Sequence, residues 1–162
     1  MSPLLRPIVV LFLIACVTRP ALSSPTPLSP EKEAQLQQIV LQEVNRYRQS
    51  KGMNKLVLSD VLSKEAKQHS FDMASKKMTF GHQDFDKRIA HIKREITNFG
   101  GGAENIAWYK IPPNEVVKKW LTSRGHKRNI EGRYNLTGIG VVQDERGWIY
   151  YTQIFVKDNQ IG

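Results

Sequence analysis

The fold class follows from one stretch near the end of the chain, LTGIGVVQDERGWIYYTQIFV, which covers residues 136–156. Its two halves, 136–142 and 148–156, are rich in β-branched and aromatic residues, which favour strands. The segment Asp144-Glu-Arg-Gly147 between them is typical of a hairpin turn. Most of the chain before this stretch shows the helical period instead. Because helices come first and a hairpin closes the chain, the sequence predicts an α+β fold.

Apolar spacing predicts three clear helices before this hairpin. The first covers residues 31–50, where Leu36, Val40 and Val44 share one face, and Ser29-Pro30-Glu31 gives start signals. The second runs from the Ser59-Asp60 cap to about residue 77, and the third covers about residues 113–123. Between the first and third helices we expect an extended segment at 55–58, a short helix at 86–96, a break at the glycines 100–102 and a strand at 105–109. After the third helix we expect one helical turn at 126–130.

Length and composition narrow the class of protein. A chain of 162 residues suits one domain, and a 40% hydrophobic content excludes wholesale disorder. One cysteine cannot form an internal disulfide. The net charge of +9 favours anionic partners such as membrane surfaces or cell-wall polymers, without choosing among them. The densest basic stretch, 118–133, holds six Lys and Arg against the single acid Glu131, and fits either a solvated helix end or an anion-binding face.

The N-terminus has the layout of a secretory signal. A single Arg6 precedes an apolar run at 7–15, which is too short for a membrane-spanning helix. Residues 17–30 are rich in Pro, Ser and Thr and are expected to form a tether. The sequence therefore predicts a signal segment at 1–23, or at 1–15 if Cys16 is lipidated, then the tether and a domain at 31–162.

Cys16 has two interpretations. In the first, Leu13-Ile-Ala-Cys16 is a bacterial lipobox, and acylation of Cys16 anchors the chain to a membrane. In the second, Cys16 is a small apolar residue of an ordinary signal peptide that is cleaved after Ser23. The position of the only cysteine at the end of the apolar run, before a tether, favours lipidation. Either way we expect an extracytoplasmic protein, secreted or membrane-anchored.

Three residues stand out as candidates for a site. His82 and His126 lie beside glycines in expected loops, where an imidazole can be aimed freely. Glu104 opens an apolar strand, where a carboxylate is costly unless it is paired or is a ligand. His69 is expected to be structural because it lies on an apolar helix face, and His91 is expected to be solvated. Phosphate-loop and serine-hydrolase motifs do not fit this sequence.

The order and spacing of short motifs resemble the CAP superfamily, or SCP domain, of cysteine-rich secretory, antigen 5 and pathogenesis-related proteins. The likeness is strongest to short, cysteine-free bacterial members and covers nearly all of residues 33–157. It implies an α-β-α sandwich with a small antiparallel sheet between helical layers. The matching motifs include Val44-Asn-Arg-Tyr-Arg48, Phe80-Gly-His82, Ala103-Glu-Asn-Ile-Ala107, Trp120-Leu-Thr-Ser123, Gly125-His126, Gly138-Ile-Gly-Val141 and Tyr151-Thr-Gln-Ile-Phe155.

The resemblance also implies a cleft with a tetrad of two histidines and two glutamates, which binds a divalent cation in several family members. His82, Glu104 and His126 fall on three of these positions, and Ser123 replaces the fourth at the rim of the cleft. Zinc or another divalent cation is therefore the implied cofactor, held less tightly than by four ligands. Its binding should weaken below about pH 6, because a protonated imidazole cannot ligate.

Three functions remain open at this point. The favoured one is a non-enzymatic exported binding module for lipid or an anionic envelope polymer. The first alternative is a metal-dependent hydrolase that activates water in the same cleft. It is less favoured because Glu104 cannot easily be both metal ligand and general base. The second alternative is a structural protein of the cell envelope. Nucleic acid is not an expected partner.

Overall fold

The computed structural model describes residues 28–160. The predictions for the signal segment, for Cys16 and for residues 17–27 of the tether lie outside these residues. The described chain forms α1 (Pro30–Ser50), β1 (Val57–Leu58), α2 (Asp60–Ala74), α3 (Phe85–Glu95), β2 (Phe99–Tyr109), α4 (Pro113–Thr122), α5 (Arg124–Ile130), β3 (Leu136–Gln143) and β4 (Ile149–Asp158).

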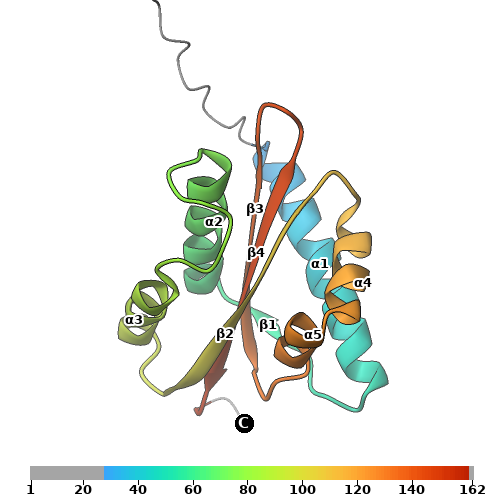
Figure 1. The fold of residues 1–162 in the computed structure, drawn as a ribbon. Coiled ribbons are helices and arrows are strands. Elements are labelled where there is room, and N and C mark those ends of the chain that lie inside the picture. The colour runs from blue at the N-terminus through green and yellow to red at the C-terminus, as the bar shows by residue number, and fades with distance from the viewer. Residues whose placement is uncertain (1–27, 161–162) are drawn as a thin grey trace, which may run out of the picture.

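These elements build three layers (Figure 1). A four-stranded sheet in the order β1-β3-β4-β2 lies in the middle, with α2 and α3 on one side and α1, α4 and α5 on the other. The sheet is antiparallel apart from the two-residue β1, which pairs in parallel with β3. The predicted α+β class and α-β-α sandwich are confirmed. Strand β2, which pairs only with β4 in this order, is an edge strand of the described sheet.

Helix ends mostly fall close to the predicted positions. The Ser29 side chain accepts a hydrogen bond from the Lys32 main-chain nitrogen and caps α1, whose first residue is a proline. The Ser59 side chain caps α2 in the same way, but this helix ends at Ala74 rather than near residue 77. Helix α5 starts at Arg124, so Gly125 lies inside it.

The prediction of a break at the glycines 100–102 is wrong, because β2 runs through them. The pairing of β2 with β4 shifts register between Phe99 and Gly101, and Gly101 has a positive φ of 134°. A Cβ atom at Gly102 would come within 2.9 Å of the Ile89 side chain. These glycines therefore permit an irregularity and a close contact inside a strand, rather than ending it.

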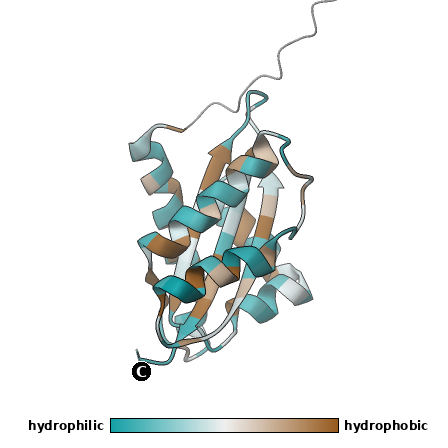
Figure 2. Ribbon diagram, turned by 90° about the vertical axis from the view of Figure 1, so that its left-hand side faces the viewer, coloured by the Kyte–Doolittle hydropathy of each residue, from teal (hydrophilic) through white to brown (hydrophobic). Residues whose placement is uncertain are grey.

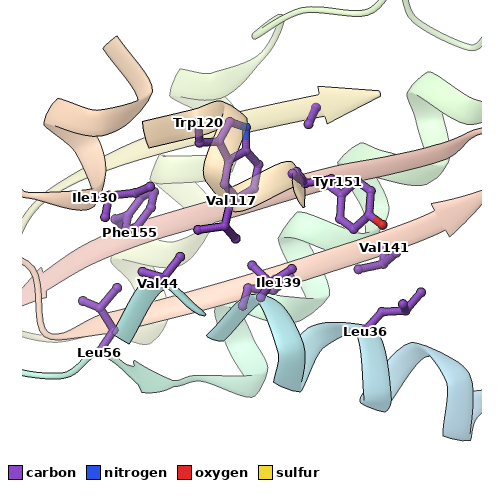
Figure 3. Close-up of a cluster of buried hydrophobic side chains, with 13 residues drawn as sticks. Leu36, Val44, Leu56, Val117, Trp120, Ile130, Ile139, Val141, Tyr151 and Phe155 are labelled. Atoms are coloured by element: carbon purple, nitrogen blue, oxygen red, sulfur yellow. The ribbon is translucent and has the colours of Figure 1, made fainter. Parts of the chain in front are cut away.

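The larger hydrophobic core lies between the sheet and the α1–α4 layer (Figure 3). Val44, Val117, Trp120, Ile139 and Phe155 are all buried there. The Trp120 indole nitrogen also donates a hydrogen bond to the main-chain oxygen of Ile106, at 3.1 Å. Seen from the α2–α3 side, the front helices are mostly hydrophilic and the strands behind them carry many hydrophobic residues (Figure 2). Among residues 28–160, no helix is long and apolar enough to span a membrane.

Two glycines of β3 bring α2 directly onto the sheet. A Cβ atom at Gly138 would lie 2.1 Å from the backbone of Leu62, and one at Gly140 would lie 2.2 Å from the backbone of Ala66. The Ser70 hydroxyl, one turn further along α2, donates a hydrogen bond to the Gly140 carbonyl oxygen at 3.1 Å. Because this contact is backbone against backbone, it fixes where α2 presents its side chains.

Replacement of the buried tryptophan tests the position of α4. Trp120→Ala should lower the free energy of unfolding by about 3–5 kcal/mol, because it leaves a cavity and an unpaired carbonyl. Trp108→Ala is the matched control, since Trp108 is 41% exposed, and should cost about 1 kcal/mol or less. Urea unfolding followed by circular dichroism measures both. A loss of less than about 1 kcal/mol for Trp120→Ala would contradict the packing described here.

Candidate functional site

The carboxylate of Glu104 is the centre of the candidate site. Glu104 lies in the middle of β2, and its side chain is 2% exposed, on the face of the sheet covered by α2 and α3. Two nitrogens of Arg88, from α3, each donate a hydrogen bond to a different oxygen of this carboxylate. Nε lies 2.9 Å from Oε2, and Nη2 lies 2.8 Å from Oε1. This two-pronged contact is the strongest geometry that an arginine and a carboxylate can adopt.

Two histidines complete the surroundings of the carboxylate. His82, in the loop between α2 and α3, places Nδ1 2.8 Å from Oε1 of Glu104, while half of its side chain remains exposed. His69, on α2, is fully buried, with Nε2 3.0 Å from the Gly81 carbonyl oxygen and 3.7 Å from the same Oε1. The Gly81 contact holds the loop that carries His82.

His126 belongs to the opposite layer. It lies on α5, and its ring centre is 6.3 Å from that of Trp120. Its main-chain oxygen accepts a hydrogen bond from the Asn105 side chain at 3.1 Å, and the Asn129 side chain donates to the main-chain oxygen of Glu104 at the same distance. These amides tie α5 to β2, so the helix is fixed beside the strand that carries Glu104.

The predicted site residues are thus placed as follows. His82 and Glu104 are in direct contact, and His126 lies near enough for the charge of His82 to affect its pKa. Ser123 is partly buried at the junction of α4 and α5, where its main-chain nitrogen donates to the Trp120 carbonyl oxygen. Its proposed place at the rim of a cleft stays a prediction.

Protonation states follow from burial and from these contacts. Burial alone would raise the pKa of Glu104, but the hydrogen bonds from His82 and Arg88 and the charge of Arg88 outweigh it and hold the pKa below its ordinary value. Burial lowers the pKa of His69, although the charge of Glu104 partly offsets this. Burial and the charge of His82 lower the pKa of His126. At neutral pH we therefore expect an ionised Glu104 and neutral His69 and His126.

This arrangement does not fit a divalent cation as it stands. Both oxygens of Glu104 accept hydrogen bonds from Arg88, whose charge is permanent, and one of them also contacts Nδ1 of His82. Within residues 28–160, no three His, Cys, Asp or Glu side chains are grouped so that they could hold a metal ion. Zinc binding, which the resemblance implies, stays a prediction that these contacts do not favour.

Sequence reasoning missed Arg88 as a site residue and treated His69 as structural only. Arg88 lies in a helix rich in charged residues, and an arginine in such a helix is normally expected to face solvent. A signal was nevertheless present, because Arg88, Ile92 and Ile96 are four residues apart and so share one helical face. The two isoleucines are buried, and Arg88 is buried with them.

An aromatic patch lies further along β2 from Glu104. It consists of Phe80, Trp108, Trp148 and Tyr150, and the centre of the Trp108 ring is 6.3 Å, 4.7 Å and 5.8 Å from those of the other three, respectively. Phe80 is 48% exposed and Trp108 is 41% exposed. Both line a hollow of about 420 Å³ that Met73, Lys76, Lys77, Met78, Thr79 and Tyr150 also line.

The three layers and the residues gathered around β2 define a domain of the cysteine-rich secretory class. The model described as "CAP: Cysteine-rich secretory protein family" matches residues 41–155, and the chain belongs to this family. Among curated proteins, the chain is 34% identical over 134 residues to the uncharacterized protein YkwD of Bacillus subtilis. That match covers 82% of this chain and 51% of YkwD, so the chain spans about half the length of this relative.

Solved structures show the same fold. An outer surface protein from Borrelia burgdorferi superposes with a TM-score of 0.71 at 21% identity, over 83% of this chain and 99% of that one. An extracellular protein containing an SCP domain, from Bacillus anthracis, superposes with a TM-score of 0.66 at 26% identity, over 82% of this chain and 45% of that one. Both neighbours are described as extracellular or surface proteins.

The lowered pKa values of His69 and His126 predict a loss of stability in mild acid. His69 and His126 have lowered pKa values in the folded state, so the unfolded chain binds more protons below its ordinary histidine pKa of about 6.5. The free energy of unfolding should therefore fall as the pH drops from about 7 to 5, by up to about 1.4 kcal/mol per pH unit for each histidine. Below about pH 4.3 the protonation of Glu104 should add to the loss.

Urea unfolding at a series of pH values measures this slope. His126→Gln should flatten it between about pH 7 and 5, because one group that binds a proton only after unfolding is removed. Gln42→Ala is the control, because Gln42 is an exposed residue of α1 that does not titrate, and it should leave the slope as it is. A wild-type stability that is constant over this range would show that His69 and His126 are not held neutral by the fold.

Proposed function

We propose that this CAP-family chain is exported and acts as a non-enzymatic binding module on an anionic lipid surface of the cell envelope. The observation that carries the proposal is the aromatic patch, in which Phe80 and Trp108 stay exposed beside Lys76 and Lys77. Exposed aromatic rings rimmed by cations are typical of surfaces that rest at a membrane interface.

The chemistry of the patch suits this ligand. Tryptophan and phenylalanine gain free energy when they leave water for the boundary of the acyl chains. Lysines near a surface are attracted to anionic headgroups, by about 1 kcal/mol each. The Lys110 ammonium also lies over the Trp148 ring, 5.1 Å from its centre, and adds a third cation to the patch. The charge of the whole chain, +9, has the same sign.

The position of the patch agrees with attachment through the N-terminus. Figure 1 places the start of α1 at the same end of the molecule as the β3–β4 turn and the end of β2, which carries Trp108 near its terminus. If Cys16 is acylated, the thirteen residues 17–29 between it and α1 can span about 45 Å at most. Such an anchor would keep this end of the domain near the membrane.

The hydrolase alternative has less support. A hydrolytic site of this kind needs a free carboxylate as general base or metal ligand, and the Glu104 carboxylate is already bound to Arg88 through both oxygens. No specific contact among residues 28–160 favours a purely structural role. The binding module therefore remains the function that the described surface supports best.

Vesicle binding tests the proposal. The fragment 28–162, which contains every helix and strand described and has no acyl anchor, should sediment with vesicles of phosphatidylglycerol and phosphatidylcholine. Phe80→Ala/Trp108→Ala should weaken binding at least about tenfold, because about 1.4 kcal/mol of apolar burial is lost. High salt should weaken the binding of both proteins, since lysines contribute.

Val57→Ala is the matched control for this experiment. Val57 is 58% exposed but lies in β1, at the opposite end of the molecule from the patch (Figure 1). Its replacement should leave vesicle binding unchanged. Equal binding by all three proteins, or no binding by the unaltered fragment, would contradict a lipid-facing patch. Binding to isolated cell-wall polymer instead of vesicles would keep the binding module and reassign its partner.

A further inference from the structure

We infer that Arg88 is the permanent cation of this cleft. Its guanidinium takes the place beside Glu104 in which the family resemblance puts a divalent metal ion, so the native protein does not bind such an ion through His82, Glu104 and His126. The inference does not depend on the proposed function, because it concerns the state of the cleft rather than the aromatic patch.

The contacts of Arg88 engage both oxygens of the Glu104 carboxylate. Nε and Nη2 each bond one oxygen of Glu104, and Nη1 donates to the main-chain oxygen of Gln83 at 2.7 Å. The side chains of Arg88 and Glu104 are 9% and 2% exposed. All three guanidinium nitrogens are therefore engaged, and the pair is largely shielded from water, which strengthens the attraction between its charges.

Electrostatics oppose the entry of a metal ion. The charge of Glu104 is already balanced by Arg88, so the site offers no net negative charge to a dication. A dication bound to the same oxygens would also lie beside a guanidinium that cannot lose its proton. The Nδ1 of His82 contacts Oε1 of Glu104 at 2.8 Å and leaves Nε2 free for a ligand, so the group that Arg88 withholds from a metal ion is the Glu104 carboxylate.

Arg88 also supplies the cross-link that a bound ion would otherwise give. Through Glu104 it joins α3 to β2, and through the Gln83 carbonyl it holds the loop that carries His82. A metal ion held by His82, Glu104 and His126 would likewise join this loop to β2, and it would add α5, which Asn105 and Asn129 already tie to β2. The geometry therefore explains how the cleft can keep its shape without an ion, and it predicts that a chelator does not destabilise the protein.

Zinc titration of the fragment 28–162 and of its Arg88→Ala variant tests this inference. The unaltered fragment should show no zinc binding that depends on His82 or His126, and the same melting temperature with zinc as with EDTA. Arg88→Ala frees the carboxylate, so it should bind one zinc ion at least about tenfold more tightly than the unaltered fragment and melt at a higher temperature when zinc is present. Adding His126→Ala to this variant should remove the gain.

Arg94→Ala is the matched control, because Arg94 is an exposed arginine of the same helix, and it should behave as the unaltered fragment does. One equivalent of zinc bound by the unaltered fragment, and lost in both His82→Ala and His126→Ala, would overturn the inference. So would a folded Arg88→Ala variant that gains no zinc affinity. If Arg88→Ala fails to fold even with zinc, the titrations of the unaltered fragment and of the two histidine variants decide alone.

Discussion

The pairing of one buried carboxylate with one buried guanidinium holds the site around Glu104 together. An ionised glutamate with 2% of its side chain exposed is tolerated only when hydrogen bonds and an opposite charge compensate for the lost water. Arg88 provides both, and His82 adds a third contact. Through these bonds a single side chain of β2 fixes α3 and the loop before it. The site therefore has a built-in cation and is more than a set of potential metal ligands.

The packing of α2 and the position of β2 in the sheet determine what surrounds the Arg88–Glu104 pair. Gly138 and Gly140 let α2 lie directly on β3. The position of α2 in turn places His69 next to the Glu104 carboxylate. Strand β2 is an edge strand, and it contacts α3 in one helical layer and α5 in the other. The same strand carries Glu104 and, four residues later, Trp108, so the Glu104 site and the aromatic patch lie along one face of β2.

Most of the fold could be predicted from local patterns in the sequence. The helical period around Val44 and Trp120, the Ser29 and Ser59 caps and the closing hairpin all depend on near neighbours in the chain. The path of β2 could not be predicted in this way. From sequence alone, Gly101 and Gly102 indicate a loop. They belong to a strand because they pair with β4 and because Ile89 packs closely against Gly102.

The site was predictable only in part for the same reason. Family resemblance indicated His82, Glu104 and His126, and the first two are in contact. The role of Arg88 was not predicted, because its partner Glu104 is sixteen residues away and on another element. No local pattern in the sequence shows that the charge of Arg88 is buried. The helical spacing of Arg88, Ile92 and Ile96 was the one available signal. This spacing indicates which face of the helix is buried, but it does not identify the carboxylate that Arg88 contacts.

A double-mutant cycle on the buried pair tests this account most directly. Arg88→Met and Glu104→Gln, each alone, should lower the free energy of unfolding by about 3–5 kcal/mol, because each leaves a buried charge without its partner. The double variant removes both charges and should cost much less than the sum, which gives a coupling of at least about 2 kcal/mol. Urea unfolding of the four proteins at neutral pH supplies the cycle. Costs that simply add would show that Arg88 and Glu104 act independently and would contradict the central place given to this pair.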